Sequence, residues 1–180
     1  MKAYKIALGG IISALCLLTM FMTGIFPALS ILLPMISGIF MMIMVSEISM
    51  SWAFLTYVSV SLLSLILTFD KESVLLFIMF FGHYPITRFI INRIKSKPLR
   101  MTLKISVFNI CVIAFFLFTT YILKLTAFLE EIKAFGKYGI PAILIFVNII
   151  FILYEYNLNI FYEIYKKKLK PFLKKNNISE

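Results

Sequence analysis

The stretch FFGHYPITR at residues 80–88 lies inside a long apolar segment and contains the only histidine of the chain, a proline and an arginine. Because Pro85 carries no amide hydrogen, the carbonyl oxygen of Phe81 loses its helical partner, and lipid cannot replace that partner. The charged side chain of Arg88 costs several kcal/mol in a bilayer unless it meets another polar group or water. The stretch therefore predicts a membrane-spanning helix in the middle of a bundle, with other helices packed around it.

The composition of the whole chain agrees with a membrane protein. Of its 180 residues, 62% are hydrophobic and 14% are charged, whereas soluble domains carry about 25% charged residues. The formal charge of +10 comes from basic residues at the ends of apolar segments, where they face anionic lipid headgroups. The expected partner is therefore a lipid bilayer and not a nucleic acid. Cys16 and Cys111 lie in apolar runs and indicate neither a disulfide nor a metal site.

Hydropathy predicts six spans within a single domain, residues 1–180. No charged residue occurs from Ile6 to Ser46, a run of about 61 Å as an α-helix and so roughly two bilayer cores. This run is too long for a signal peptide, and it predicts a retained first span, a tight turn at Pro27 and a second span kinked at Pro34. The expected spans are residues 6–26, 28–46, 51–69, 73–92, 103–123 and 139–160, with an amphipathic interfacial segment at 124–138 and a basic interfacial tail at 161–180.

The basic residues also predict the orientation of the bundle. If both termini lie on one side of the membrane, fourteen of the eighteen Lys and Arg residues lie on that side. Basic residues accumulate on the cytoplasmic side of membrane proteins. We therefore expect an all-α integral membrane bundle of six transmembrane helices in the cell membrane, with both termini cytoplasmic.

Charged residues inside the expected spans predict an intramembrane ion pair. Arg88 and Glu155 lie at matching depths, about 22 Å and about 24 Å from the same end of their helices. Glu47, at the inner edge of the second span, is a second candidate partner for Arg88. The alternative is that Arg88 extends alone to the inner headgroups.

Uncharged polar residues predict where a substrate would bind. His83, Asn109 and Asn148 lie near the middle of three different spans, and Tyr84 follows His83. Polar side chains at the bilayer centre usually face the protein interior and often line a site, so these four residues are candidates for substrate binding. The alternative is that His83 only forms a hydrogen bond between helices.

Small residues on the first span predict a close helix contact. Gly10 and Ala14 lie one helical turn apart, so another backbone can approach closely at this position. The contact could be packing inside the bundle or docking of a partner.

Catalytic and metal-binding motifs are missing from the sequence, which has no Walker-type loop, no His-Glu-x-x-His, no Gly-x-Ser-x-Gly and no Cys-x-x-Cys. We therefore expect neither an enzyme nor a bound cofactor or metal.

Six spans, both termini inside, and a first helix that opens KIALGGIISAL at residues 5–15 together resemble the substrate-binding S-components of energy-coupling factor (ECF) transporters. The run FGHYP at residues 81–85 is similar to that of small six-span proteins grouped with this family. The resemblance implies capture of a small molecule, such as a vitamin or a precursor, near the outer face. It also implies docking through Gly10 and Ala14 on a transmembrane T-component, with separate subunits that hydrolyse ATP. The alternative is a membrane scaffold or assembly protein that binds no small molecule.

Overall fold

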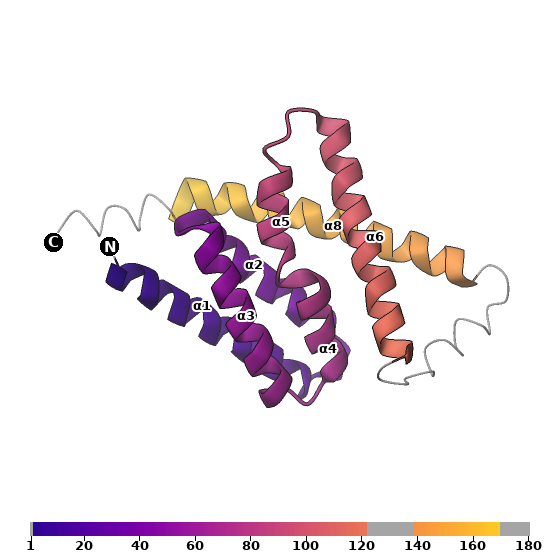
Figure 1. Ribbon diagram of the computed structural model, residues 1–180, viewed down its shortest axis with the longest axis horizontal. Helices are drawn as coiled ribbons and strands as arrows, with labels where there is room; N and C mark the ends of the chain where they lie inside the picture. The colour runs from indigo at the N-terminus through magenta and orange to yellow at the C-terminus, as the bar shows by residue number, and fades with distance from the viewer. Residues whose placement is uncertain (1, 122–138, 170–180) are drawn as a thin grey trace. The chain divides into compact units, whose positions relative to one another are not determined.

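The computed structural model describes residues 2–121 and 139–169, and every regular element in these ranges is a helix (Figure 1). The prediction of an all-α fold is therefore confirmed. The elements are α1 (Lys2–Thr23), η1 (Pro27–Leu29), α2 (Leu32–Glu47), α3 (Met50–Leu67), α4 (Lys71–Leu76), η2 (Phe77–Phe81), α5 (Tyr84–Ile91), α6 (Lys97–Tyr121), α8 (Gly139–Ile164) and η4 (Tyr165–Leu169). The amphipathic segment expected at 124–138 and most of the expected tail lie outside the described residues.

Five helical segments are long and apolar enough to cross a membrane. They are Ala3–Thr23, Met50–Leu67, Lys71–Ile91, Lys97–Tyr121 and Gly139–Lys167, and α2 is a shorter apolar helix. By the length and composition of its helices the chain is thus a multi-pass membrane protein, which confirms the bilayer as its partner. The chain divides into two compact units, Met1–Ile140 and Pro141–Glu180, which are described separately below.

The second helix differs from its predicted form. It has 16 residues and begins at Leu32, whereas the sequence predicted a span from residue 28. Pro27 opens the short 3-10 helix η1 ahead of it. The predicted kink in the outer half of this span is not found, because α2 begins at Leu32 and Pro34 lies in its first turn. Amide groups in a first turn have no partner in the helix, so a proline is tolerated there.

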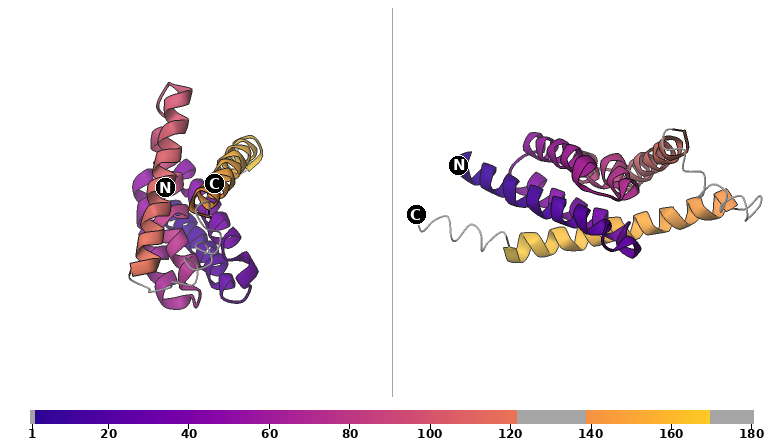
Figure 2. Two further views of the ribbon diagram at one scale, coloured as in Figure 1. Left: turned by 90° about the vertical axis from the view of Figure 1, so that its right-hand side faces the viewer. Right: turned by 90° about the horizontal axis from the view of Figure 1, so that it is seen from below.

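Despite its length, α2 is the central helix of the first unit. It contacts α1, α3, α4, η2 and α5, and Figures 1 and 2 show α1 and α3 alongside it. Its buried face includes Ser37, Gly38 and Met41. The hydroxyls of Thr19 on α1 and Ser37 on α2 lie 2.6 Å apart and form a hydrogen bond between the two helices.

The turn between α3 and α4 is held by its own charged residues. The carboxylate of Asp70 accepts a hydrogen bond from the backbone N–H of Ser73 at 3.1 Å and so caps α4. The ammonium group of Lys71 donates to the carbonyl oxygens of Leu65 and Thr68 at 2.7 and 2.8 Å, which closes the end of α3. Charged residues at the ends of apolar helices usually lie in the headgroups or in water.

Candidate functional site

The span Lys71–Ile91 is broken in its middle. After α4 the backbone widens into the π-helical turn η2, passes through Gly82 and His83, and resumes as α5 with Pro85 in its first turn. Within η2 the N–H of Gly82 donates to the carbonyl oxygen of Phe77, five residues back, at 2.8 Å. Single π-turns in helices are frequent at functional sites. The break therefore defines the candidate site.

A tyrosine from another helix compensates for the π-turn. Because the Gly82 N–H reaches back to Phe77, the carbonyl oxygen of Ile78 loses its usual donor. The phenolic hydroxyl of Tyr57 on α3 donates to this oxygen at 2.8 Å. The break is thus joined to α3 by a side chain that lies 21 residues earlier in the chain.

His83 supplies a hydrogen-bond donor to the next carbonyl oxygen, that of Met79. Its ring atom Nε2 lies 2.8 Å from the carbonyl oxygen of Met79 and donates to it, because a carbonyl oxygen can only accept. The Sγ atom of Cys111 on α6 lies 3.9 Å from the same nitrogen, and the ring of Tyr57 meets the imidazole edge-on. The sequence predicted that the carbonyl oxygen of Phe81 needs a donor, which stays a prediction. The side-chain donors of Tyr57 and His83 reach the carbonyl oxygens of Ile78 and Met79, three and two residues before Phe81.

Gly82 is required by the close approach of two aromatic rings. A Cβ atom at this position would lie 2.7 Å from Cδ2 of Tyr57 and 2.8 Å from Cζ of Phe77. The backbone of Gly82 is in the ordinary right-handed helical region, which any residue can adopt. Glycine is therefore favoured here because there is no room for a side chain, and not because of its conformational freedom. The absence of a side chain here is what lets Tyr57 reach the backbone of η2.

The predicted substrate-binding residues are only partly brought together. Tyr84 is fully buried, and its ring packs at 4.6 Å between centroids against that of Phe80, next to the break. The side-chain amide of Asn109 on α6 donates to the carbonyl oxygen of Ile105 on its own helix at 2.8 Å. Asn148 makes the same type of bond to Leu144 on α8, in the second unit. Substrate binding by these residues stays a prediction.

The predicted ion pair also stays a prediction, because Arg88 lies on α5 and Glu155 on α8, in different units. Arg88 is buried, with 5% of its surface exposed, and Glu47 is the last residue of α2. Lys104 on α6 is buried to the same degree. Lys104 is one of the fourteen basic residues assigned above to the cytoplasmic side, and its place beyond the basic loop, at the start of an apolar run, was a signal of burial.

The small-residue motif of α1 faces away from the core of its unit. A Cβ atom on Gly10 would meet nothing within 4 Å, and Ala14 is exposed. The neighbouring Gly9 points the other way, since its Cβ would lie 3.3 Å from the methyl group of Met44 on α2. Close packing inside the unit therefore involves Gly9, while Gly10 and Ala14 remain open on the surface.

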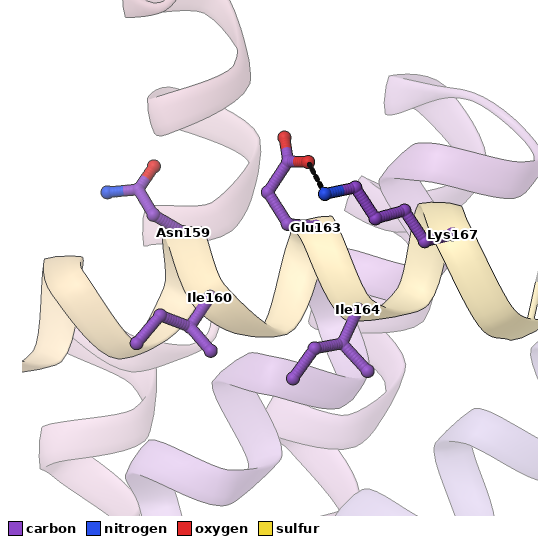
Figure 3. A pocket seen from close by; sticks show the side chains of 5 residues that line it. All are labelled: Asn159, Ile160, Glu163, Ile164 and Lys167. Carbon is purple, nitrogen blue, oxygen red and sulfur yellow. Dashed lines mark ion pairs between the residues drawn. The ribbon is translucent and has the colours of Figure 1, made fainter.

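A shallow hollow lies along one face of α8 and η4 in the second unit (Figure 3). Glu163 and Lys167 form an exposed ion pair across it, with the carboxylate oxygen 3.9 Å from the ammonium nitrogen. The hollow is lined by Asn159, Ile160, Glu163, Ile164 and Lys167. Because all five residues come from consecutive turns of one helical stretch, the hollow is a surface feature and not an enclosed site.

Sequence reasoning missed Tyr57, Gly82 and Cys111 as parts of the site. The available signal was Tyr57 itself, a tyrosine in the middle of a span and far from the interfaces that tyrosine prefers.

Across residues 2–121 and 139–169, no three His, Cys, Asp or Glu residues are grouped in a way that could hold a metal ion. In comparisons with protein-family models, with curated proteins and with solved structures, the chain matches none.

Proposed function

We propose that this chain is the membrane-embedded binding subunit of an uptake transporter, similar to the S-components of ECF transporters, in the cell membrane with both termini cytoplasmic. The observation that carries the proposal is the outward direction of Gly10 and Ala14. A small-residue pair that no neighbouring side chain fills leaves a groove in which another helix can approach closely. In the proposed assembly this second helix belongs to a T-component, and separate ATPase subunits supply the energy.

The broken helix is the proposed place of ligand capture. Hydrogen bonds from Tyr57 and His83 to the carbonyl oxygens of Ile78 and Met79 hold the break in its present form. A polar ligand near mid-membrane could exchange its own hydrogen bonds with these groups, as broken helices do in transporters. His83 and Tyr84 are the proposed contacts at the break, together with Asn109 on α6. Asn148 on α8 remains a candidate from the sequence alone. The role is binding, without catalysis or a cofactor, and the substrate class is a small molecule.

A membrane scaffold is the second candidate, and one observation favours it. The rings of Tyr57 and Phe77 fill the space around Gly82, and the Nε2 atom of His83 is already engaged by Met79. In this interpretation the break joins α3, η2 and α6, and its polar groups are engaged within the protein. In a scaffold, Gly10 and Ala14 would dock a structural partner, and the purified protein would carry no small molecule.

The proposal is tested by purifying the tagged full-length chain with its native partners. Gly10→Leu and Ala14→Leu should abolish co-purification of a transmembrane partner and its ATPase subunits while the variant protein melts normally. Ser59→Leu, which adds a similar side chain at an exposed position of α3, is the matched control and should leave assembly intact. Gly9→Leu should instead lower the melting temperature, because overpacking against Met44 costs about 1–3 kcal/mol in the free energy of unfolding.

Two outcomes would contradict the proposal. If Gly10→Leu lowered the melting temperature as Gly9→Leu does and left assembly unchanged, the motif would serve packing and not docking. If the partners contained no ATPase and mass spectrometry of the native complex detected no small molecule, the scaffold would be the better description.

A further inference from the structure

The segment that joins α1 to α2 is almost entirely apolar, and all of its residues except Ser30 are exposed. We call residues 24–31 the α1–α2 loop. Ser30 carries its only polar side chain, and Ile25, Phe26 and Ile31 each expose about half of their surface. Phe69, two residues past the end of α3, continues this surface. It is 82% exposed, and its ring lies 6.5 Å from that of Phe21, between centroids. Water would be a poor solvent for such a surface.

The length of α2 places this loop below the level of the membrane surface. A helix of 16 residues spans about 24 Å, while the hydrocarbon core is about 30 Å thick. If Glu47 marks the far boundary of the core, the first residue of α2 lies about 6 Å inside the near boundary. The loop must then cross this remaining depth.

Most N–H groups of the loop have a partner within the protein, which lowers the cost of placing this backbone in lipid. Five of its seven N–H groups donate to nearby carbonyl oxygens, at distances of 2.9–3.2 Å. They are those of Gly24, Ile25, Phe26, Leu29 and Ser30. Pro27 has no N–H to satisfy, and the hydroxyl of Ser73 lies 2.7 Å from the carbonyl oxygen of Ser30. Irregular backbone without such bonds is costly at membrane depth.

The neighbouring turn at the same end of the unit shows the contrast. Residues 68–70 connect α3 to α4, with Asp70 as the cap of α4. Lys71 and Glu72 form the first turn of α4, and their side chains are exposed. A charged turn of this kind belongs in the headgroups or in water. The Ser73–Ser30 hydrogen bond ties the two regions together, but only the α3–α4 connection and the start of α4 carry charged side chains.

From these observations we propose that the α1–α2 loop is immersed in the acyl chains of one membrane leaflet, with its apolar side chains in contact with lipid. The loop follows directly on α1, and the contact between Phe21 and Phe69 joins its surface to the region just past α3. Interfacial amphipathic helices bury their apolar faces about 5–10 Å into the boundary between headgroups and acyl chains, and we expect a similar depth for the loop. The loop then fills the membrane depth that the short helix α2 does not span, and it keeps water away from the first residues of α2.

The chain offers a clean fluorescence test, because Trp52 is its only tryptophan. In a Trp52→Phe background of the full chain, Phe26→Trp and Ile31→Trp place one probe at two exposed loop positions. Glu72→Trp places the same probe in the charged turn at the same end and is the matched control. Each protein is reconstituted into phosphatidylcholine vesicles with bromine atoms at a shallow or a deep acyl position, and into plain vesicles titrated with aqueous iodide.

Both loop probes should lose emission in brominated vesicles, more with shallow than with deep bromine, and should resist iodide. Glu72→Trp should show the opposite pattern. Iodide quenching of the loop probes equal to that of Glu72→Trp would overturn the proposal, because the loop would lie in water. Quenching by neither reagent would also overturn it, because protein, from a second copy or a partner, would then cover the loop.

Discussion

The phenolic hydroxyl of Tyr57 on α3 donates a 2.8 Å hydrogen bond to the backbone carbonyl oxygen of Ile78, inside the π-turn of the broken span. One side chain thereby satisfies an acceptor that the widened backbone has released. The same ring packs against Gly82 and Phe77. The form of the break is thus determined jointly by α3 and by the span that contains it.

Removing the Tyr57 hydroxyl should destabilise the protein without changing its fold. Tyr57→Phe keeps the ring contacts and leaves the carbonyl oxygen of Ile78 without a donor. We expect a loss of about 0.5–2 kcal/mol in the free energy of unfolding, since hydrogen bonds inside membrane proteins are individually modest. The measurement is denaturant unfolding in micelles, followed by the emission of Trp52. Tyr156→Phe, at an exposed position of α8, is the control, and equal stability of the two variants would show that the Tyr57 bond is unimportant.

Adding one methyl group at Gly82 should be more damaging. The Cβ of Gly82→Ala would lie 2.7–2.8 Å from ring atoms of Tyr57 and Phe77, so the rings or the backbone must move. Overpacking of this size costs about 1–3 kcal/mol. Gly10→Ala adds the same group in open space and should melt like the parent protein. Equal melting temperatures for the two variants would mean that the rings move aside freely.

The predicted contact between Arg88 and Glu155 calls for a double-mutant cycle. Breaking a buried ion pair leaves an unpaired charge and should cost about 3–5 kcal/mol. Arg88→Leu and Glu155→Leu together should therefore be less harmful to expression and melting temperature than either change alone. The same cycle with Glu47→Leu tests the second candidate. Strictly additive effects in both cycles would argue against either pair.

The distribution of basic residues predicts which loops face the cytoplasm. Cys16 and Cys111 are first replaced by Ala, and one cysteine is then introduced as Ser96→Cys or as Glu72→Cys, both exposed positions. A membrane-impermeant maleimide added to intact cells should label Glu72→Cys and reach Ser96→Cys only after permeabilisation. Labelling in the reverse pattern would invert the predicted orientation.

The membrane character and the helical class of this protein could be predicted from its sequence, because both depend on local composition. The uncharged run from Ile6 to Ser46 and the polar turn at Asp70 mark where helices begin and end, within a few residues. A break near Pro85 was predictable for the same reason, since a proline acts on its own helix. The shortness of α2 was not predictable, because apolar residues 24–31 carry the same signal whether they lie in a span or in a loop.

Only the tertiary structure decided which groups satisfy the break and which face of α1 remains open. Gly9 and Gly10 are chemically identical neighbours, and only the packing of α1 against α2 and α3 turns one toward Met44 and the other toward open space. Likewise, a sequence contains no local signal that joins Tyr57 to Ile78. The bond forms because α3 packs against η2 in a position where Gly82 lets the ring of Tyr57 reach the backbone. This position depends on all the side-chain contacts between the packed helices.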